Sequence, residues 1–95
     1  MLHILTKAPD SDAARQMQQA IADDDAIVLI EAGVQAALHT QWDGWALYES
    51  RVYLLAEDIT AWGLDEFVDS REFATIDMQG FIGLTEQHTQ TVTWY

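Results

Sequence analysis

The stretch Ala26-Ile27-Val28-Leu29-Ile30, followed by Glu31-Ala32-Gly33-Val34, decides the fold class. Five consecutive apolar residues with many branched side chains are typical of a strand that is buried on both faces of a parallel sheet. The glycine that follows predicts a tight passage from this strand into a short helix, because glycine adopts turn conformations that other residues resist. Parallel strands need a crossover connection, so a strand that leads directly into a helix predicts an α/β fold.

The same order of strand and helix recurs on both sides of this stretch. Short apolar segments predict strands at residues 2–5, 26–30, 51–56 and 73–76. Helical spacing predicts helices at residues 13–21, 31–38, 57–62, 64–70 and 78–87, and residues 39–50 are expected to mix loop and short helix. This alternation predicts a single domain over residues 1–95, with a doubly wound, mostly parallel sheet and helices on both of its faces.

The end of the chain is expected to hold one helix and a tail without regular structure. Asp77 stands where an N-cap is needed, just before the last helix. The apolar face of that helix should contain Met78, Phe81 and Ile82. Residues 89–95 show no helical or strand pattern, and we expect them to form a polar tail.

The charge of the chain restricts its partners. Sixteen acidic residues outweigh four basic ones, for a net charge of −12, and the basic residues are scattered at Lys7, Arg15, Arg51 and Arg71. Nucleic-acid binding needs clustered Lys and Arg, so direct binding of nucleic acid is not expected. The acidity favours solubility or a partner with a basic surface. The run of three Asp at residues 23–25 should be a solvated turn that ends the first helix.

The chain contains no cysteine. This excludes disulfides, cysteine-ligated zinc, iron–sulfur clusters and any thiolate or persulfide chemistry on this chain. The apolar start of the chain is too short for a signal sequence, and no apolar run approaches the ~20 residues that span a bilayer. We therefore expect a cytoplasmic protein that does not enter a membrane.

Acidic residues follow several predicted strands, at the edge where open α/β sheets hold ligands. Glu31, Glu57, Asp58 and Asp77 could converge there for acid–base work or magnesium binding, but helix capping explains Asp58 and Asp77 more simply. The edge has no glycine-rich phosphate motif, and the histidines are far apart in sequence. His3, inside the first strand, is expected to be a hydrogen-bonded structural residue. The sequence thus predicts no catalytic, cofactor-binding or metal-binding residue.

Aromatic residues are more numerous than a core of this size readily fills. Trp and Tyr are enriched at the buried centres of protein interfaces. Trp62 is equally consistent with core packing and with a partner contact. The candidate partner interface consists of Trp42, Trp45, Tyr48, Trp94 and Tyr95.

Taken together, the motifs resemble those of the TusB/DsrH family of sulfur-relay subunits over nearly the whole chain. They are Met1-Leu2-His3; Ile27-Val28-Leu29-Ile30-Glu31 with Gly33-Val34 and Ala36-Ala37; Tyr53 with Leu55-Ala56-Glu57-Asp58, Ala61 and Gly63-Leu64; and Ile76-Asp77 with Gly80-Phe81, Leu84-Thr85, His88 and Trp94. The resemblance implies a DsrE-like fold. It also implies a non-catalytic role as the smallest subunit of a TusBCD-like heterohexamer that holds two copies of each chain.

Such a complex would contain TusC-like and TusD-like subunits, with the sulfur-carrying cysteine on the TusD-like one. A TusE-like carrier would take the sulfur onward for 2-thiolation of the tRNA wobble uridine. DsrH-type members can carry a cysteine, so its absence favours the TusB-like role. Two alternatives stay open: a DsrH-like subunit of a DsrEFH-type sulfur-oxidation complex, and a stand-alone small-ligand or metal-dependent enzyme.

Overall fold

A computed structural model describes residues 1–69 and 72–95 of the chain. The strands are β1 (Leu2–Leu5), β2 (Ala26–Leu29), β3 (Val52–Leu55), β4 (Ala74–Ile76) and β5 (Thr91–Trp94). The α-helices are α1 (Asp12–Ala20), α2 (Asp43–Tyr48), α3 (Ala56–Ala61) and α4 (Met78–Gln87), and the 3₁₀ helices are η1 (Glu31–Leu38), η2 (Glu49–Arg51) and η3 (Asp65–Phe67). These elements confirm the predicted alternation of strand and helix.

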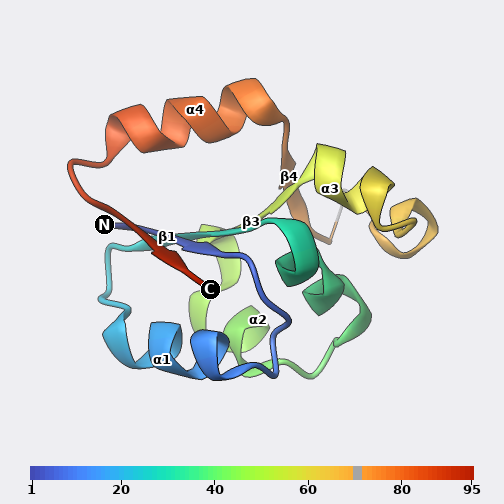
Figure 1. Cartoon of the computed structure of the whole chain (residues 1–95), viewed down its shortest axis with the longest axis horizontal. Helices are drawn as coiled ribbons and strands as arrows, with labels where there is room; N and C mark the ends of the chain where they lie inside the picture. Colours follow the sequence, from blue (N-terminus) through green and yellow to red (C-terminus); the bar gives the residue numbers. More distant parts are fainter. Residues whose placement is uncertain (70–71) are drawn as a thin grey trace.

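The five strands form one sheet in the order β4-β3-β2-β1-β5, and all neighbouring strands are parallel. The chain first steps outward from β1 to β4 and then returns past β1 to add β5. Because parallel crossovers are right-handed, this reversal of direction places the connections on opposite faces of the sheet. Figure 1 shows α1 and α2 on one face and α4 on the other. The predicted doubly wound α/β fold is therefore confirmed.

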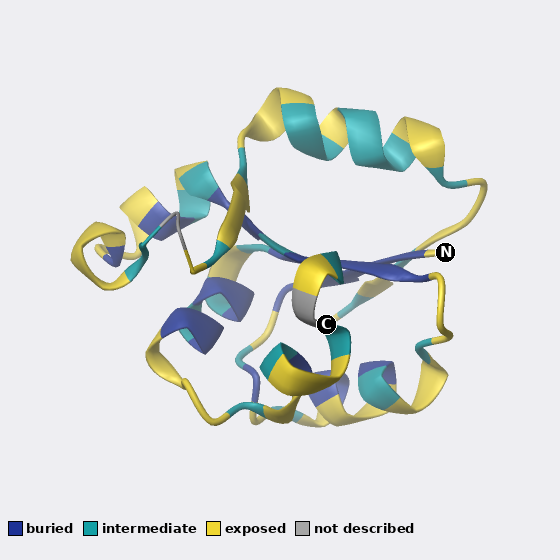
Figure 2. Cartoon of the chain, turned by 180° about the vertical axis from the view of Figure 1, so that it is seen from behind, coloured by how far each residue is buried: buried dark blue, intermediate teal, exposed yellow. Residues whose placement is uncertain are grey.

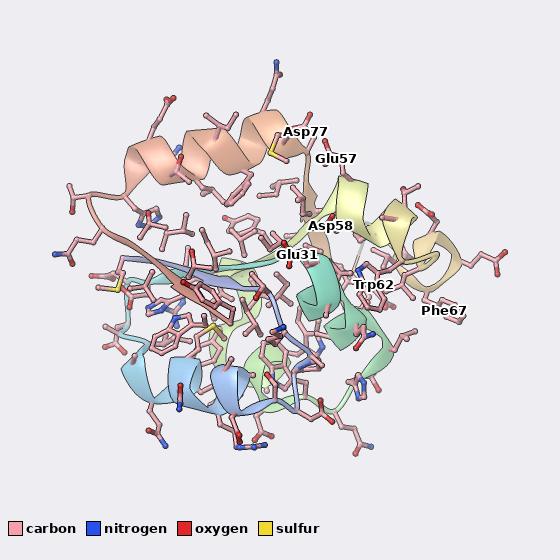
Figure 3. The ribbon with its side chains drawn as sticks, in the orientation of Figure 1. Glu31, Glu57, Asp58, Trp62, Phe67 and Asp77 are labelled. Atoms are coloured by element: carbon pink, nitrogen blue, oxygen red, sulfur yellow. The ribbon has the colours of Figure 1, made fainter. Side chains whose placement is uncertain are left out.

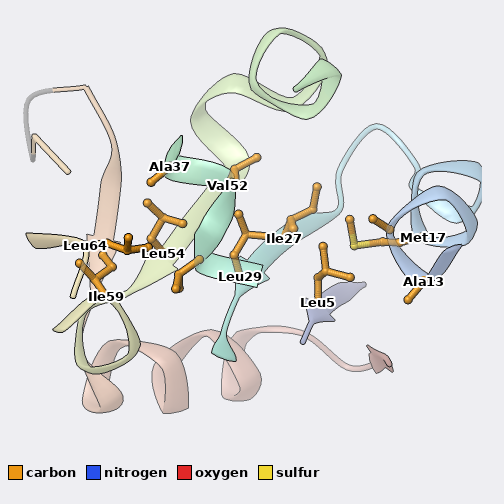
Figure 4. Packing of buried hydrophobic residues seen from close by; sticks show 13 residues of the cluster. Leu5, Ala13, Met17, Ile27, Leu29, Ala37, Val52, Leu54, Ile59 and Leu64 are labelled. Carbon is orange, nitrogen blue, oxygen red and sulfur yellow. The ribbon is translucent and has the colours of Figure 1, made fainter. Parts of the chain in front are cut away.

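Side chains of the central strands alternate between two hydrophobic cores. Leu5, Ile27, Leu29, Val52 and Leu54 belong to the larger core, together with residues of α1 and η1 (Figure 4). Leu2, Ile4, Ala26 and Val28 point to the opposite side and form the smaller core under α4. This period of two buries each central strand on both faces, as the continuous apolar run at residues 26–30 predicts.

Helix α4 buries fewer of its apolar side chains against the sheet than its sequence predicts. Phe81 and Leu84 pack against the smaller core, whereas Met78 and Ile82 are 45% and 50% exposed. The prediction that Met78 and Ile82 face the core was wrong. Phe81 and Leu84 are three positions apart and define the face of α4 that packs on the sheet, whereas Met78 and Ile82 lie to one side of that face. Figure 2 shows the resulting half-buried helix.

Two further segments differ from expectation. Residues 89–95 are not a tail, because residues 91–94 form β5 beside β1. Their Thr-Val-Thr-Trp sequence alternates exposed and half-buried side chains, which is a strand pattern of period two. The helix predicted at residues 64–70 is reduced to the single 3₁₀ turn η3, and Ser70 lies outside the described residues.

Candidate functional site

Figure 3 labels the four acidic residues that follow the strands, Glu31, Glu57, Asp58 and Asp77. The carboxylates of Glu57, Asp58 and Asp77 accept hydrogen bonds from backbone amides of this chain. The Asp77 carboxylate accepts a hydrogen bond from the Gly80 N–H at 2.8 Å, which confirms its role as N-cap of α4. The Glu57 carboxylate accepts from the Met78 N–H at 3.0 Å. Both carboxylates therefore satisfy donors in the first turn of the same helix, which intrahelical bonds cannot reach.

Asp58 does not cap its own helix, so that prediction was wrong. Helix α3 begins at Ala56, immediately after β3, and this places Asp58 in its first turn rather than before it. Its carboxylate instead accepts a hydrogen bond from the Glu31 N–H at 2.6 Å and links α3 to η1. Glu31 itself has a positive φ of 50°, an uncommon conformation for a residue with a side chain. Within residues 1–69 and 72–95, no group of three or more acidic or histidine side chains is arranged to hold a metal ion.

The ends of β1 and β5 mark the point where the strand order reverses, the usual ligand site of an open α/β sheet. Here the two strands bind each other. The Thr6 N–H and the Thr6 hydroxyl both donate to the Trp94 carbonyl oxygen, each at 3.1 Å. A Cβ atom on Gly33 would lie 2.5 Å from the Leu5 carbonyl oxygen, so η1 packs directly on the end of β1. These contacts hold β5 and η1 against the end of β1.

Three of the five candidate interface residues lie on or beside α2. The Trp45 indole N–H donates to the carbonyl oxygens of Ala36 and His39, at 3.1 and 3.2 Å. Its ring also makes edge contacts with Trp42 and Phe73, with centroid distances of 5.4 and 5.0 Å. These contacts attach α2 to η1 and to the segment before β4.

Tyr48, Trp94 and Tyr95 complete the candidate set. Tyr48 is half-buried, and the Arg51 guanidinium lies 5.6 Å from the centre of its ring. Trp94 is half-buried on β5 and packs against the larger core, as Trp42, Trp45 and Tyr48 do. Tyr95 is 82% exposed. The structure thus places three residues around α2 and two at the end of β5, and their role as a partner interface remains a prediction.

A chain of hydrogen bonds joins Trp94 to the first residues of the sequence. The Trp94 indole N–H lies 3.0 Å from His3 Nδ1, and His3 Nε2 lies 2.8 Å from an Asp25 oxygen. An indole N–H only donates, so Nδ1 must accept and the proton of the neutral imidazole must be on Nε2. His3 is fully buried, which confirms the expected structural histidine.

Asp25 is the centre of this network and not part of a solvated turn, so that prediction was wrong for the third acid of the run. Its side chain also accepts from the Ala22 N–H at 2.9 Å and from the Met1 amino group at 3.0 Å. Burial alone would raise the pKa of this carboxyl, but the Ala22 amide, the His3 ring and the Met1 amino group together hold the pKa well below its ordinary value. Three consecutive Asp give no sign of which one is buried.

Comparison of the sequence with known proteins identifies the family of this chain. A model of the family described as DsrH like protein matches residues 7–91. The chain belongs to this DsrH-like family. It is 34% identical over 96 residues to Protein TusB of Pectobacterium parmentieri and 32% identical over 100 residues to Protein TusB of Escherichia fergusonii. Both alignments cover 99% of this chain and 100% of the relative. The resemblance to the TusB/DsrH family is confirmed.

Two exposed aromatic residues of this DsrH-like protein were not included in the candidate partner interface predicted from the sequence. Trp62 and Phe67 are 45% and 58% exposed, at the ends of α3 and η3. The sequence left Trp62 undecided between core and interface and assigned Phe67 to the apolar spacing of a helix. Spacing cannot decide exposure here, because the predicted helix does not form. No helix within the described parts of the chain is long and apolar enough to cross a membrane.

Proposed function

We propose that this DsrH-like protein is a non-catalytic subunit of a sulfur-relay complex. The observation that carries the proposal is its similarity, over the full length of both chains, to proteins named TusB. The absence of cysteine supports the non-catalytic part, since sulfur transfer proceeds through a thiolate that attacks a persulfide or disulfide sulfur.

The complex that we propose is a TusBCD-like heterohexamer in the cytoplasm. It would contain two copies each of this chain, a TusC-like subunit and a TusD-like subunit. The TusD-like subunit would carry the sulfur on its cysteine and pass it to a TusE-like carrier, for 2-thiolation of the tRNA wobble uridine. This chain would contribute surfaces that bind the other subunits and would carry out no sulfur transfer itself.

A second candidate is a subunit of a DsrEFH-type sulfur-oxidation complex. The description of the matching family as DsrH like favours it. The same subunit role applies in both complexes, because in each the chain itself lacks a thiol. The identity of the co-purifying chains and the presence of a thiolated tRNA product distinguish the two candidates.

The test is purification of a tagged chain from its own cells, followed by identification of its partners by mass spectrometry. We expect TusC-like and TusD-like chains in equal amounts with the tagged chain. After incubation with a persulfide donor, the mass of this chain should stay unchanged while a partner gains sulfur. A stable sulfur adduct on this chain, or recovery of the chain without either partner, would contradict the proposal.

The net charge of −12 allows an independent test of whether this chain itself binds tRNA. The isolated chain should produce no gel shift with tRNA at physiological salt, because it has no cluster of Lys and Arg to neutralise phosphates. A shift at micromolar protein that weakens as salt is added would show direct RNA binding and would overturn the expectation.

A further inference from the structure

Helix α3, the turn after it and η3 form a lobe, residues 56–69, at one end of the molecule beside β4 (Figure 1). This α3–η3 lobe presents Trp62 and Phe67 to solvent, at 45% and 58% exposure (Figure 3). Trp is among the residue types that contribute most to binding at protein interfaces. Two large exposed aromatic side chains on one lobe therefore mark it as a candidate contact surface.

The buried interior of the lobe is made of aliphatic residues and not of these two aromatic ones. Ile59 and Leu64 fill its interior and are only 4% and 6% exposed. Gly63, with φ +69°, ends α3, and the Leu64 N–H donates to the Ile59 carbonyl oxygen at 2.9 Å. The turn is thus held by its backbone and its buried aliphatic residues. Polar residues at positions 62 and 67 would avoid the cost of exposing apolar surface to water.

The charge of the lobe specifies the kind of partner. Among residues 56–69 there is no basic residue, and the acidic ones are Glu57, Asp58, Asp65, Glu66 and Asp69. A second copy of this chain would bring the same acidic surface and a net charge of −12 to the contact, so self-association through the lobe is disfavoured. The exposed side chains of Trp62 and Phe67 lie on a lobe that carries five acidic residues. Such a surface is complementary to a partner surface with apolar side chains surrounded by Lys and Arg.

A hollow on the α3–η3 lobe suits one long basic side chain. It lies between α3, η3 and β4 and has a volume of about 180 Å³, roughly the space of six liquid waters. Its walls combine apolar and polar residues, namely Ala56, Ile59, Val68, Thr60, Thr75 and Asp65. The Asp65 carboxylate accepts from the Thr60 hydroxyl at 3.0 Å, which fixes its position. Lys and Arg bury an apolar stem and keep the charge at the tip, which matches apolar walls beside a carboxylate.

We propose that the α3–η3 lobe is a docking surface for a protein partner that presents apolar side chains ringed by Lys and Arg, one of which enters the hollow beside Asp65. The inference rests on the proposed subunit role and names the surface through which the other subunits hold this chain. Trp62 and Phe67 form the apolar centre of the contact, and Glu66 belongs to its charged rim.

The test measures binding of the full-length chain to its co-purified TusC-like and TusD-like subunits. Trp62→Ala and Phe67→Ala should each raise the dissociation constant about thirtyfold or more, the loss typical of a hot-spot residue. Ile82→Ala is the matched control, because Ile82 is 50% exposed on α4, and it should bind like the unmodified chain. All variants should remain folded at the temperature of the binding assay, which circular dichroism checks, because each substituted side chain is about half exposed and lies outside the buried cores.

The charge is tested separately. Glu66→Lys should weaken binding and reduce its dependence on salt, whereas Glu86→Lys on α4 makes the same charge change away from the lobe and should do neither. Normal binding by both aromatic variants would overturn the docking surface while leaving the subunit role intact. If Leu47→Ala on α2 were the variant that weakens binding, the interface would lie at α2 and not at the lobe. Failure of the unmodified chain to bind either subunit would refute the proposed function and this inference together.

Loss of a self-association equilibrium in Trp62→Ala, measured by sedimentation, would assign the lobe to a second copy of the chain and would also overturn the proposed partner chemistry. Sedimentation of the isolated unmodified chain should therefore show one species across the concentrations used for binding.

Discussion

Replacement of Trp94 by Phe isolates the hydrogen bond that connects the two ends of the chain. Phe retains an aromatic ring beside His3, whose ring lies nearly parallel to that of Trp94, but it removes the indole N–H. His3 Nδ1 is then a buried acceptor without a donor, because the residue is fully buried. An unsatisfied buried polar group costs about 1–3 kcal/mol. A domain of this size loses about 4–8 °C of melting temperature per kcal/mol, so we expect a decrease of at least about 4 °C.

The assay is thermal unfolding followed by circular dichroism, with Trp62→Phe as control because that Trp is 45% exposed. ¹⁵N spectra of the unmodified chain should show the His3 proton on Nε2. An unchanged melting temperature, or a His3 proton on Nδ1, would refute the reasoning. Assembly measured on the same variant addresses the interface role predicted for Trp94: a lower melting temperature with normal assembly would limit Trp94 to the stability of its own domain.

Two further predictions concern stability. Gly33→Ala should destabilise the fold by about 1–3 kcal/mol in chemical denaturation, because its Cβ would lie 2.5 Å from the Leu5 carbonyl oxygen. Gly83→Ala should instead be neutral or stabilise by up to about 1 kcal/mol, because nothing lies within 4 Å of its added Cβ in α4. The pKa of Asp25 is lowered by folding, so its contribution is complete above about pH 4 and is lost as the pH falls further. The free energy of unfolding, measured by circular dichroism at several pH values below about 4, should therefore fall less steeply with decreasing pH in Asp25→Asn than in the unmodified chain. An equal dependence on pH in both proteins would contradict the assignment.

The sequence predicted what depends on local patterns and missed what depends on distant partners. The four early strands follow from short apolar runs, and the cap at Asp77 follows from its position before a helix. Asp25 looks like its two acidic neighbours, and only the fold brings it to His3, 22 residues away in sequence. Strand β5 was missed because an edge strand of four residues has a weak pattern, which becomes meaningful only when β1 is available beside it.

The candidate interface shows the same limit. Aromatic composition predicted more Trp and Tyr than a core of this size readily fills, but it could not show which of them would stay exposed. Trp45 donates to two carbonyl oxygens within its own chain, whereas Trp62 remains 45% exposed at the end of α3. The difference arises from the turn at Gly63, which allows Leu64 rather than Trp62 to fill the interior of the lobe.

The contacts at the carboxyl edge of the sheet hold neighbouring parts of this α/β domain together. Catalysis on such folds needs polar groups left free at the carboxyl ends of the strands. Here Asp58, Glu57 and Asp77 bind backbone N–H groups of the same chain, and the Thr6 hydroxyl binds the end of β5. These hydrogen bonds connect η1, α3 and α4 at this edge of the sheet. Two exposed aromatic side chains, Trp62 and Phe67, lie on the α3–η3 lobe, where burial by the proposed partner would remove from water apolar surface that this small domain leaves exposed.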